Sequence, residues 1–142
     1  MHQIKLILTG TVPSKKNGKQ MICRPFPRMI SKPAYYKWHE EWMWKIKKFR
    51  PKKPIEMCSI HIDYYGENFR HADLDNKNTT IYDLLKDCEF IIDDNWFVIK
   101  EQSSRLVSID KDNPRAEIMI TPIDTHQVVH RLSAVKTKVK SQ

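Results

Sequence analysis

The feature that most restricts the fold is a succession of segments with two different hydrophobic periodicities. Apolar and polar residues alternate over 4–12 (IKLILTGTV) and 55–66 (IEMCSIHIDYYG), as in strands that bury one face. The segment 33–49 and a second segment ending near Lys86 place apolar residues at the steps of a helix. With two closing strands, the order strand, helix, strand, helix, strand, strand predicts an α+β domain with a single mixed sheet and two main helices.

Prolines and capping residues predict the boundaries of these segments. Pro13 ends the first strand, and Ser31 is expected to cap the first helix, which then runs to about Phe49. Asp75 or Asn76 is expected to cap the second helix, with its apolar residues facing the core.

The remaining patterned segments complete the domain. Residues 21–26 predict a short strand, and residues 96–108 and 116–123 predict two strands paired as a hairpin across IDKDNPR. The chain of 142 residues fits one domain, over 1–122, followed by a basic tail over 123–142 that we expect to be flexible.

Charge points to an anionic partner and excludes some classes of protein. The formal net charge is +8. Residues 14–50 include 11 Lys or Arg but only two acids, whereas acids predominate over 54–113. A basic surface favours nucleic-acid binding, although a plain solvated surface is the alternative. We see no membrane span, no signal-peptide pattern and no CxxC spacing among the three cysteines, so we expect a cytoplasmic protein without a disulfide framework.

Two acidic pairs interrupt this basic chain about twenty residues apart, Asp73 with Asp75 and Asp93 with Asp94. On an extended segment, residues two apart project to the same side, so the first pair is expected to converge. Carboxylates brought together repel one another unless a hard cation such as Mg²⁺ or Mn²⁺ lies between them. Acids that hold a metal within a basic protein suit a nuclease, while helix capping and turn formation remain the alternatives for each acid.

The motifs DLDN at 73–76, YDLL at 82–85 and DD at 93–94 resemble the RusA family of Holliday-junction resolvases. VPSKKN at 12–17 and SKPAYYKWHEEW at 31–42 are similar to the opening and the long helix of that family, so the resemblance covers about residues 1–122. It implies a RusA-like fold and a homodimeric endonuclease that uses Mg²⁺, or Mn²⁺, to make paired symmetric nicks in four-way DNA junctions.

Carried over by position, the resemblance implies that Asp73, Asp75 and Asp94 are catalytic metal ligands and that Asp93 is an auxiliary ligand. The family typically has a lysine where this chain has Thr79. Candidates for the missing cation and for DNA contact are Lys15, Lys16, Lys19, Arg70 and Lys77. Two alternatives stay open: a junction- or duplex-binding protein with impaired catalysis, and a nuclease of the same fold that acts on other branched or single-stranded DNA.

The aromatic residues of the first helix favour a structural role. Tyr35, Trp38, Trp42 and Phe49 recur with Ile46 at helical spacing and are expected to face the core. Trp44 lies off that face and is the better candidate for contact with DNA or a second subunit. His126 and His130 lack a third ligand, and Cys58 and Cys88 are expected in the core.

Overall fold

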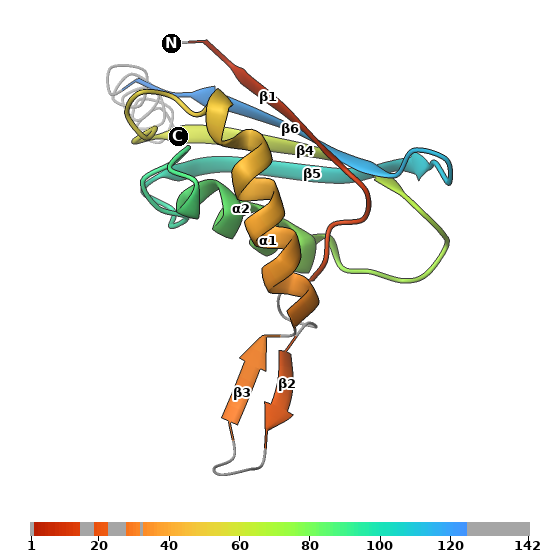
Figure 1. The fold of residues 1–142 in the computed structure, drawn as a ribbon. Helices are drawn as coiled ribbons and strands as arrows, with labels where there is room; N and C mark the ends of the chain where they lie inside the picture. The colour runs from red at the N-terminus through yellow and green to blue at the C-terminus, as the bar shows by residue number, and fades with distance from the viewer. Residues whose placement is uncertain (1, 15–18, 23–27, 32, 125–142) are drawn as a thin grey trace, which may run out of the picture.

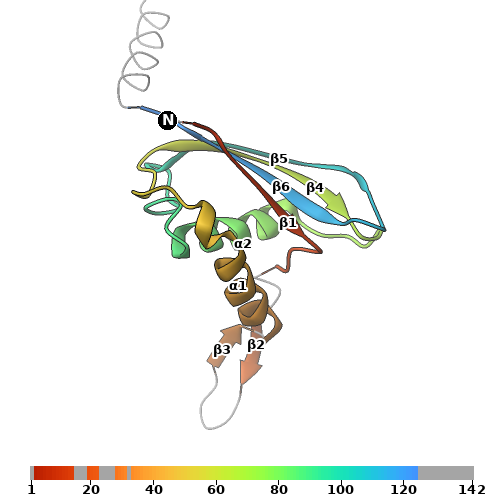
Figure 2. The same ribbon diagram turned by 45° about the horizontal axis from the view of Figure 1, so that its top comes forward.

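The computed structural model describes residues 2–14, 19–22, 28–31 and 33–124. A mixed four-stranded sheet carries both helices on one face, as Figures 1 and 2 show. The sheet consists of β1 (Ile4–Thr9), β6 (Arg115–Pro122), β4 (Cys58–Gly66) and β5 (Ile99–Ile109), in that spatial order. The helices are α1 (Pro33–Ile46), which continues as the 3₁₀ turn η1 (Lys47–Phe49), and α2 (Leu74–Asp87). The α+β prediction is confirmed at this level.

A separate hairpin projects beyond the start of α1 (Figure 1). It pairs β2 (Lys19–Ile22) with β3 (Arg28–Ser31) in antiparallel register. The sequence predicted a short strand over 21–26 but not its partner. Ser31 is the last residue of β3 and α1 begins at Pro33, so the prediction that Ser31 caps the helix is wrong.

The predicted hairpin between the last two strands is also wrong. β6 pairs antiparallel with both β1 and β4, while β5 pairs parallel with the other edge of β4. Ala116, Ile118 and Ile120 of β6 are buried, but so are Leu6 and Leu8 of the edge strand β1, so burial of one face does not fix the strand order. Most of β5 is exposed, which suits an edge strand.

The core lies between the sheet and the helices. Ile60 and Ile62 of β4 meet Ile81, Leu84 and Leu85 of α2 within one cluster of buried side chains. Neither α1 nor α2 covers the opposite side of the sheet (Figure 2), which we call the open face. Alternate residues of β4 are half-buried there, which reproduces the apolar–polar alternation of the sequence.

The aromatic stripe of α1 is confirmed as core except at its end. Tyr35, Trp42 and Ile46 are buried and Trp38 is half-buried. Phe49 is exposed, because α1 ends at Ile46 and the tighter 3₁₀ turn rotates the following side chains away from that face.

α2 ends in a Schellman motif that directs the chain back toward the sheet. The Phe90 N–H donates to the Leu85 carbonyl at 2.9 Å and the Glu89 N–H donates to the Lys86 carbonyl at 3.0 Å. The motif needs a left-handed residue after the helix, and Glu89 takes that role with φ at 64°.

Glu89→Gly is expected to raise the unfolding free energy by about 0.5 kcal/mol. A left-handed residue with a Cβ is strained by about 1–2 kcal/mol, which exceeds the backbone entropy that glycine adds to the unfolded chain. Chemical denaturation measures the change. Glu89→Ala is the matched control, because it removes the 3.3 Å ion pair with Arg50 but keeps the strained backbone. A less stable glycine variant would contradict the interpretation.

Candidate active site

The start of α2 positions the first acidic pair. Asp73 is the N-cap residue, with extended backbone at φ −89° and ψ 128°, and Asp75 lies in the first helical turn. The N-cap is therefore Asp73, not Asp75 or Asn76 as predicted. The two acids do not share one extended segment, so the strand rule for residues two apart does not apply to them.

Asp94 reaches α2 from the loop that precedes β5. A pocket of about 380 Å³, which we call the acidic pocket, is lined by Asp75, Asn78, Thr79, Tyr82, Asp94 and Gln102. The structure thus brings one member of each acidic pair to the same wall. Asp73 and Asp93 are not among the lining residues, and the described residues hold no three-carboxylate group with oxygens within 4.8 Å of one another.

Asp93 shapes the turn before β5. Its Oδ1 accepts the Asp94 N–H at 2.7 Å and its Oδ2 accepts the Asn95 side-chain amide at 3.1 Å. The backbone hydrogen bond from Asp94 is the main cause that lowers the pKa of Asp93. Both carboxylate oxygens of Asp93 therefore hold the loop that carries Asp94.

The floor of the acidic pocket is a fixed network of neutral polar groups. Asn78 accepts the Tyr64 hydroxyl at 2.7 Å and donates to Ser104 at 2.8 Å, while the Tyr82 hydroxyl donates to Gln102 at 2.8 Å. Burial raises the pKa of Tyr82 to about 12, so its hydroxyl stays protonated and remains a donor. Because these partners are satisfied, the pocket presents two carboxylates above a rigid neutral base.

Thr79, at the position where the RusA family typically has a lysine, carries no charge, and the side chain of Lys77 does not reach the acidic pocket. The Thr79 hydroxyl donates to the Asp75 carbonyl at 2.9 Å. Lys77 donates to the Val12 carbonyl at 2.7 Å, and burial lowers the pKa of Lys77. Lys77 lines a second, larger cavity and is absent from the lining of the acidic pocket.

The second cavity is also lined by Arg70, another candidate for the missing cation. It has a volume of about 830 Å³ and lies beneath residues 66–72, the connection from β4 to α2. Arg70 is exposed on its wall beside Phe69, and Leu106 and Ile109 close its apolar side. Lys15 and Lys16 lie outside the described residues, and Lys19 lies in β2.

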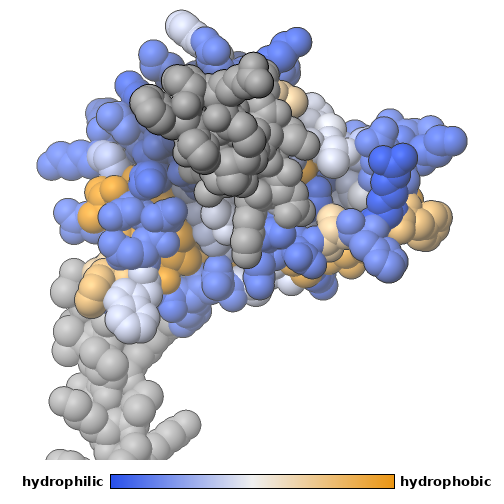
Figure 3. Space-filling view, turned by 90° about the horizontal axis from the view of Figure 1, so that it is seen from below, coloured by the Kyte–Doolittle hydropathy of each residue, from blue (hydrophilic) through white to orange (hydrophobic). Residues whose placement is uncertain are grey.

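Two exposed aromatic residues lie two and three positions after Asp94 and were not singled out from the sequence as contact residues. Trp96 is 79% exposed and Phe97 is 67% exposed, and their rings pack edge to face. On α1, Trp44 is also exposed, as its position off the buried stripe predicted, and Lys47 lies over its ring at 5.3 Å. Figure 3 shows a mostly hydrophilic surface with hydrophobic side chains gathered at two separate places.

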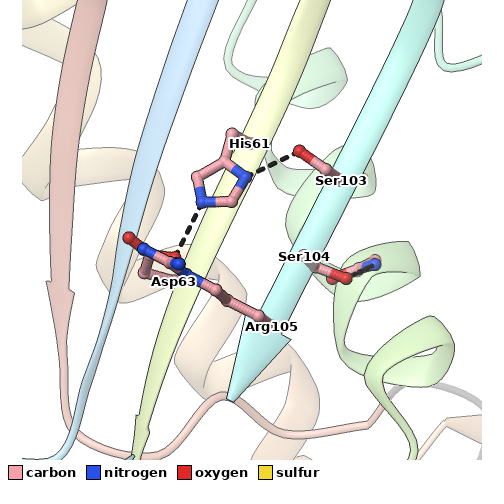
Figure 4. A network of polar contacts seen from close by, with 6 residues as sticks. His61, Asp63, Ser103, Ser104 and Arg105 are labelled. Carbon is pink, nitrogen blue, oxygen red and sulfur yellow. Dashed lines mark hydrogen bonds and ion pairs between the residues drawn. The ribbon is translucent and has the colours of Figure 1, made fainter. Parts of the chain in front are cut away.

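The open face carries a network of hydrogen-bonded polar side chains that was not predicted from the sequence. His61 lies between Ser103 at 2.6 Å from Nδ1 and Asp63 at 2.7 Å from Nε2, and Arg105 donates to the same Asp63 oxygen at 2.7 Å (Figure 4). The hydrogen bond from Arg105 is the main cause that lowers the pKa of Asp63, with His61 adding to it. A histidine and an aspartate two apart on the polar side of a strand were the available signal.

Arg105→Ala is expected to raise the pKa of Asp63 toward its ordinary value. In the wild type the ion pair stabilises the fold above about pH 4, where the unfolded carboxyl is ionised, and this contribution is lost as the pH falls through the lower folded pKa. The variant loses that acid-dependent part of its stability. NMR titration of the Asp63 carboxyl checks the shift, with Arg70→Ala as the control outside this network. An unchanged Asp63 pKa in Arg105→Ala would contradict the assignment.

Within the described residues, no helix is long and apolar enough to cross a membrane. No protein-family model matches this chain, and no curated protein matches it.

Proposed function

We propose that this chain is a Mg²⁺-dependent, structure-selective DNA endonuclease of the RusA type, which resolves four-way junctions by paired symmetric nicks. The observation that carries the proposal is that Asp75 and Asp94 line one pocket across α2. They belong to the two acidic motifs on which the resemblance rests. Two exposed carboxylates that line one pocket can share a divalent cation, which would offset their mutual repulsion.

The residues of the acidic pocket fit a hard cation. Mg²⁺ is usually held by one or two protein carboxylates and fills its other positions with water and substrate phosphates, and Mn²⁺ accepts the same donors. Asp75 and Asp94 would hold the ion, and Asp73 precedes them as the N-cap of α2, outside the pocket lining. When bound, the ion supplies Lewis-acid stabilisation for a phosphodiester under attack.

The protein's own side chains would hold the DNA around that pocket. The net charge of +8 favours contact with phosphates, and the exposed lysines of α1 and η1 include Lys45, Lys47 and Lys48. Trp96 and Phe97, two and three residues after Asp94, offer stacking surfaces for bases that are unpaired at a branch point. Asp93 would keep the Asp94 loop in place through its two local hydrogen bonds.

Paired nicks also require two copies of the site. Symmetric cleavage of a four-way junction needs active sites related by a twofold axis, which a homodimer supplies. We therefore expect the active species to be a dimer of this chain.

The decisive experiment compares a labelled four-way junction with a linear duplex of the same sequence, in Mg²⁺, Mn²⁺ or EDTA. The proposal predicts symmetric nicks that need the metal and favour the junction. Tight junction binding without cleavage in any metal would instead identify a DNA-binding protein with impaired catalysis. That alternative is favoured by the uncharged Thr79 and by Lys77, whose amine is bound to the Val12 carbonyl. Cleavage of flaps or single strands in preference to junctions would keep the chemistry and change the substrate.

A further inference from the structure

A second cluster of metal-ligating side chains joins the two helices away from the acidic pocket. His39 projects from α1, and Asp83 and Asp87 lie one turn apart on α2. One ligand atom from each residue lies within 4.8 Å of the other two. The His39 Nε2 atom is 2.9 Å from an Asp87 oxygen and 3.9 Å from an Asp83 oxygen.

The histidine nitrogen at the centre of this cluster is enclosed and lacks a hydrogen bond. The His39 and Asp83 side chains are only 15% and 14% exposed, and Nε2 itself has essentially no exposed surface. Although Asp87 is close, the contact does not have the direction of a hydrogen bond, and Nε2 has no such partner among the described residues. A buried polar atom without a partner is costly, which indicates that something else satisfies it.

The spacing of these atoms suits a small transition-metal ion. Zn²⁺ binds imidazole nitrogen and carboxylate oxygen at about 2.0–2.2 Å, which at tetrahedral angles separates neighbouring ligand atoms by roughly 3.3 Å. The two observed distances, 2.9 and 3.9 Å, lie on either side of that value. Mg²⁺ prefers oxygen ligands and near-octahedral geometry, so a site with a histidine selects against it.

A neighbouring residue already holds one of the carboxylates in place. The Tyr35 hydroxyl donates to Asp83 at 2.6 Å, to the same oxygen that lies nearest Nε2. Ligating carboxylates in metal sites are commonly oriented by such outer hydrogen bonds.

We propose that His39, Asp83 and Asp87 bind Zn²⁺ and that the ion fixes α1 against α2. Three protein ligands leave one tetrahedral position for water, and the part-exposed Asp87 opens that side of the site to solvent. The site is separate from the acidic pocket, since none of its three residues lines that pocket.

The experiment titrates metal-stripped, full-length protein with Zn²⁺ against a chromophoric chelator and repeats the titration with Co²⁺, whose visible spectrum reports coordination. We expect one tight equivalent in the wild type, a Co²⁺ spectrum of low coordination number, and a rise in melting temperature with Zn²⁺. His39→Ala and Asp87→Asn are each expected to weaken the affinity at least tenfold, and Tyr35→Phe to weaken it less.

Two controls separate this site from others. Asp75→Asn with Asp94→Asn removes the acidic pocket, and His126→Ala with His130→Ala removes the histidines of the tail; both double variants should bind Zn²⁺ as the wild type does. If His39→Ala does not fold, Asp87→Asn carries the test, because it alters only a part-exposed carboxylate. Absence of a tight equivalent, or binding that Asp87→Asn leaves unchanged, would overturn the proposal and identify the cluster as an ion pair of a protonated histidine.

Discussion

Asp75→Asn is expected to lower the rate of junction cleavage at least about a thousandfold. The change keeps the shape of the side chain but removes a charge that a divalent cation needs, and a loss of about 4 kcal/mol of transition-state stabilisation gives this factor. Asp75 is exposed in the first turn of α2, so the fold should be little affected. Single-turnover cleavage of the labelled junction measures the effect, and Asp94→Asn should match it.

Two aspartates outside the acidic pocket provide the comparison. Asp112→Asn changes an exposed acid in the turn between β5 and β6, and its cleavage rate should equal that of the wild type. Asp93→Asn keeps the shape of the side chain and one of its two acceptor oxygens in the turn that carries Asp94, so it should lose less activity than Asp75→Asn. Junction affinity should be unchanged or higher in Asp75→Asn, because a negative charge near phosphate is removed. Cleavage by Asp75→Asn at the wild-type rate would show that the acidic pocket is not the active site.

Phe90→Ala is expected to reduce the unfolding free energy by about 3–5 kcal/mol. The ring is completely buried directly after the Schellman turn, where the Phe90 carbonyl also accepts the Ile55 N–H at 2.9 Å. Removing the ring leaves a cavity between α2 and the sheet that the backbone bonds prevent from collapsing. Because domains of this size are stable by only about 5–15 kcal/mol, the variant should lie near the limit of folding.

Equilibrium denaturation measures that loss, and Phe97→Ala is its matched control. The same substitution at an exposed ring should change the unfolding free energy by less than about 0.5 kcal/mol. A loss below about 1 kcal/mol for Phe90→Ala would mean that this turn is not packed as described.

The sequence predicted the elements of the main sheet and both helices better than it predicted how they pair. Periodicity finds a strand because burial of one face is a local property, and it located β1, β4, α2 and most of α1. Strand order is a property of the whole sheet, so short separation in the chain wrongly suggested that β5 and β6 are partners. The buried residues Ala116, Ile118 and Ile120 do not reveal the central position of β6, because Leu6 and Leu8 of the edge strand β1 are buried as well.

The same difference applies to the candidate sites. The sequence could place the two acidic motifs near each other because they flank one helix, and Asp75 and Asp94 line one pocket; their role as metal ligands stays a prediction. Asp73 proved to be a cap, since the exact start of a helix depends on one residue's backbone angles. The cluster of His39, Asp83 and Asp87 depends on how α1 crosses α2, and its only sequence signal was a histidine within a buried aromatic stripe.

The central position of β6 has a consequence for how the chain acquires its structure during synthesis. Gln3, just before β1, donates a side-chain hydrogen bond to Thr121 of β6, 118 residues away in the chain. During synthesis on the ribosome, the edges of β1 and β4 that pair with β6 therefore stay unpaired until β6 emerges. Such non-local pairing slows folding and leaves edges that attract other chains. We expect the nascent chain to stay protease-sensitive until residue 122 has left the exit tunnel, and then to fold in one late, cooperative step.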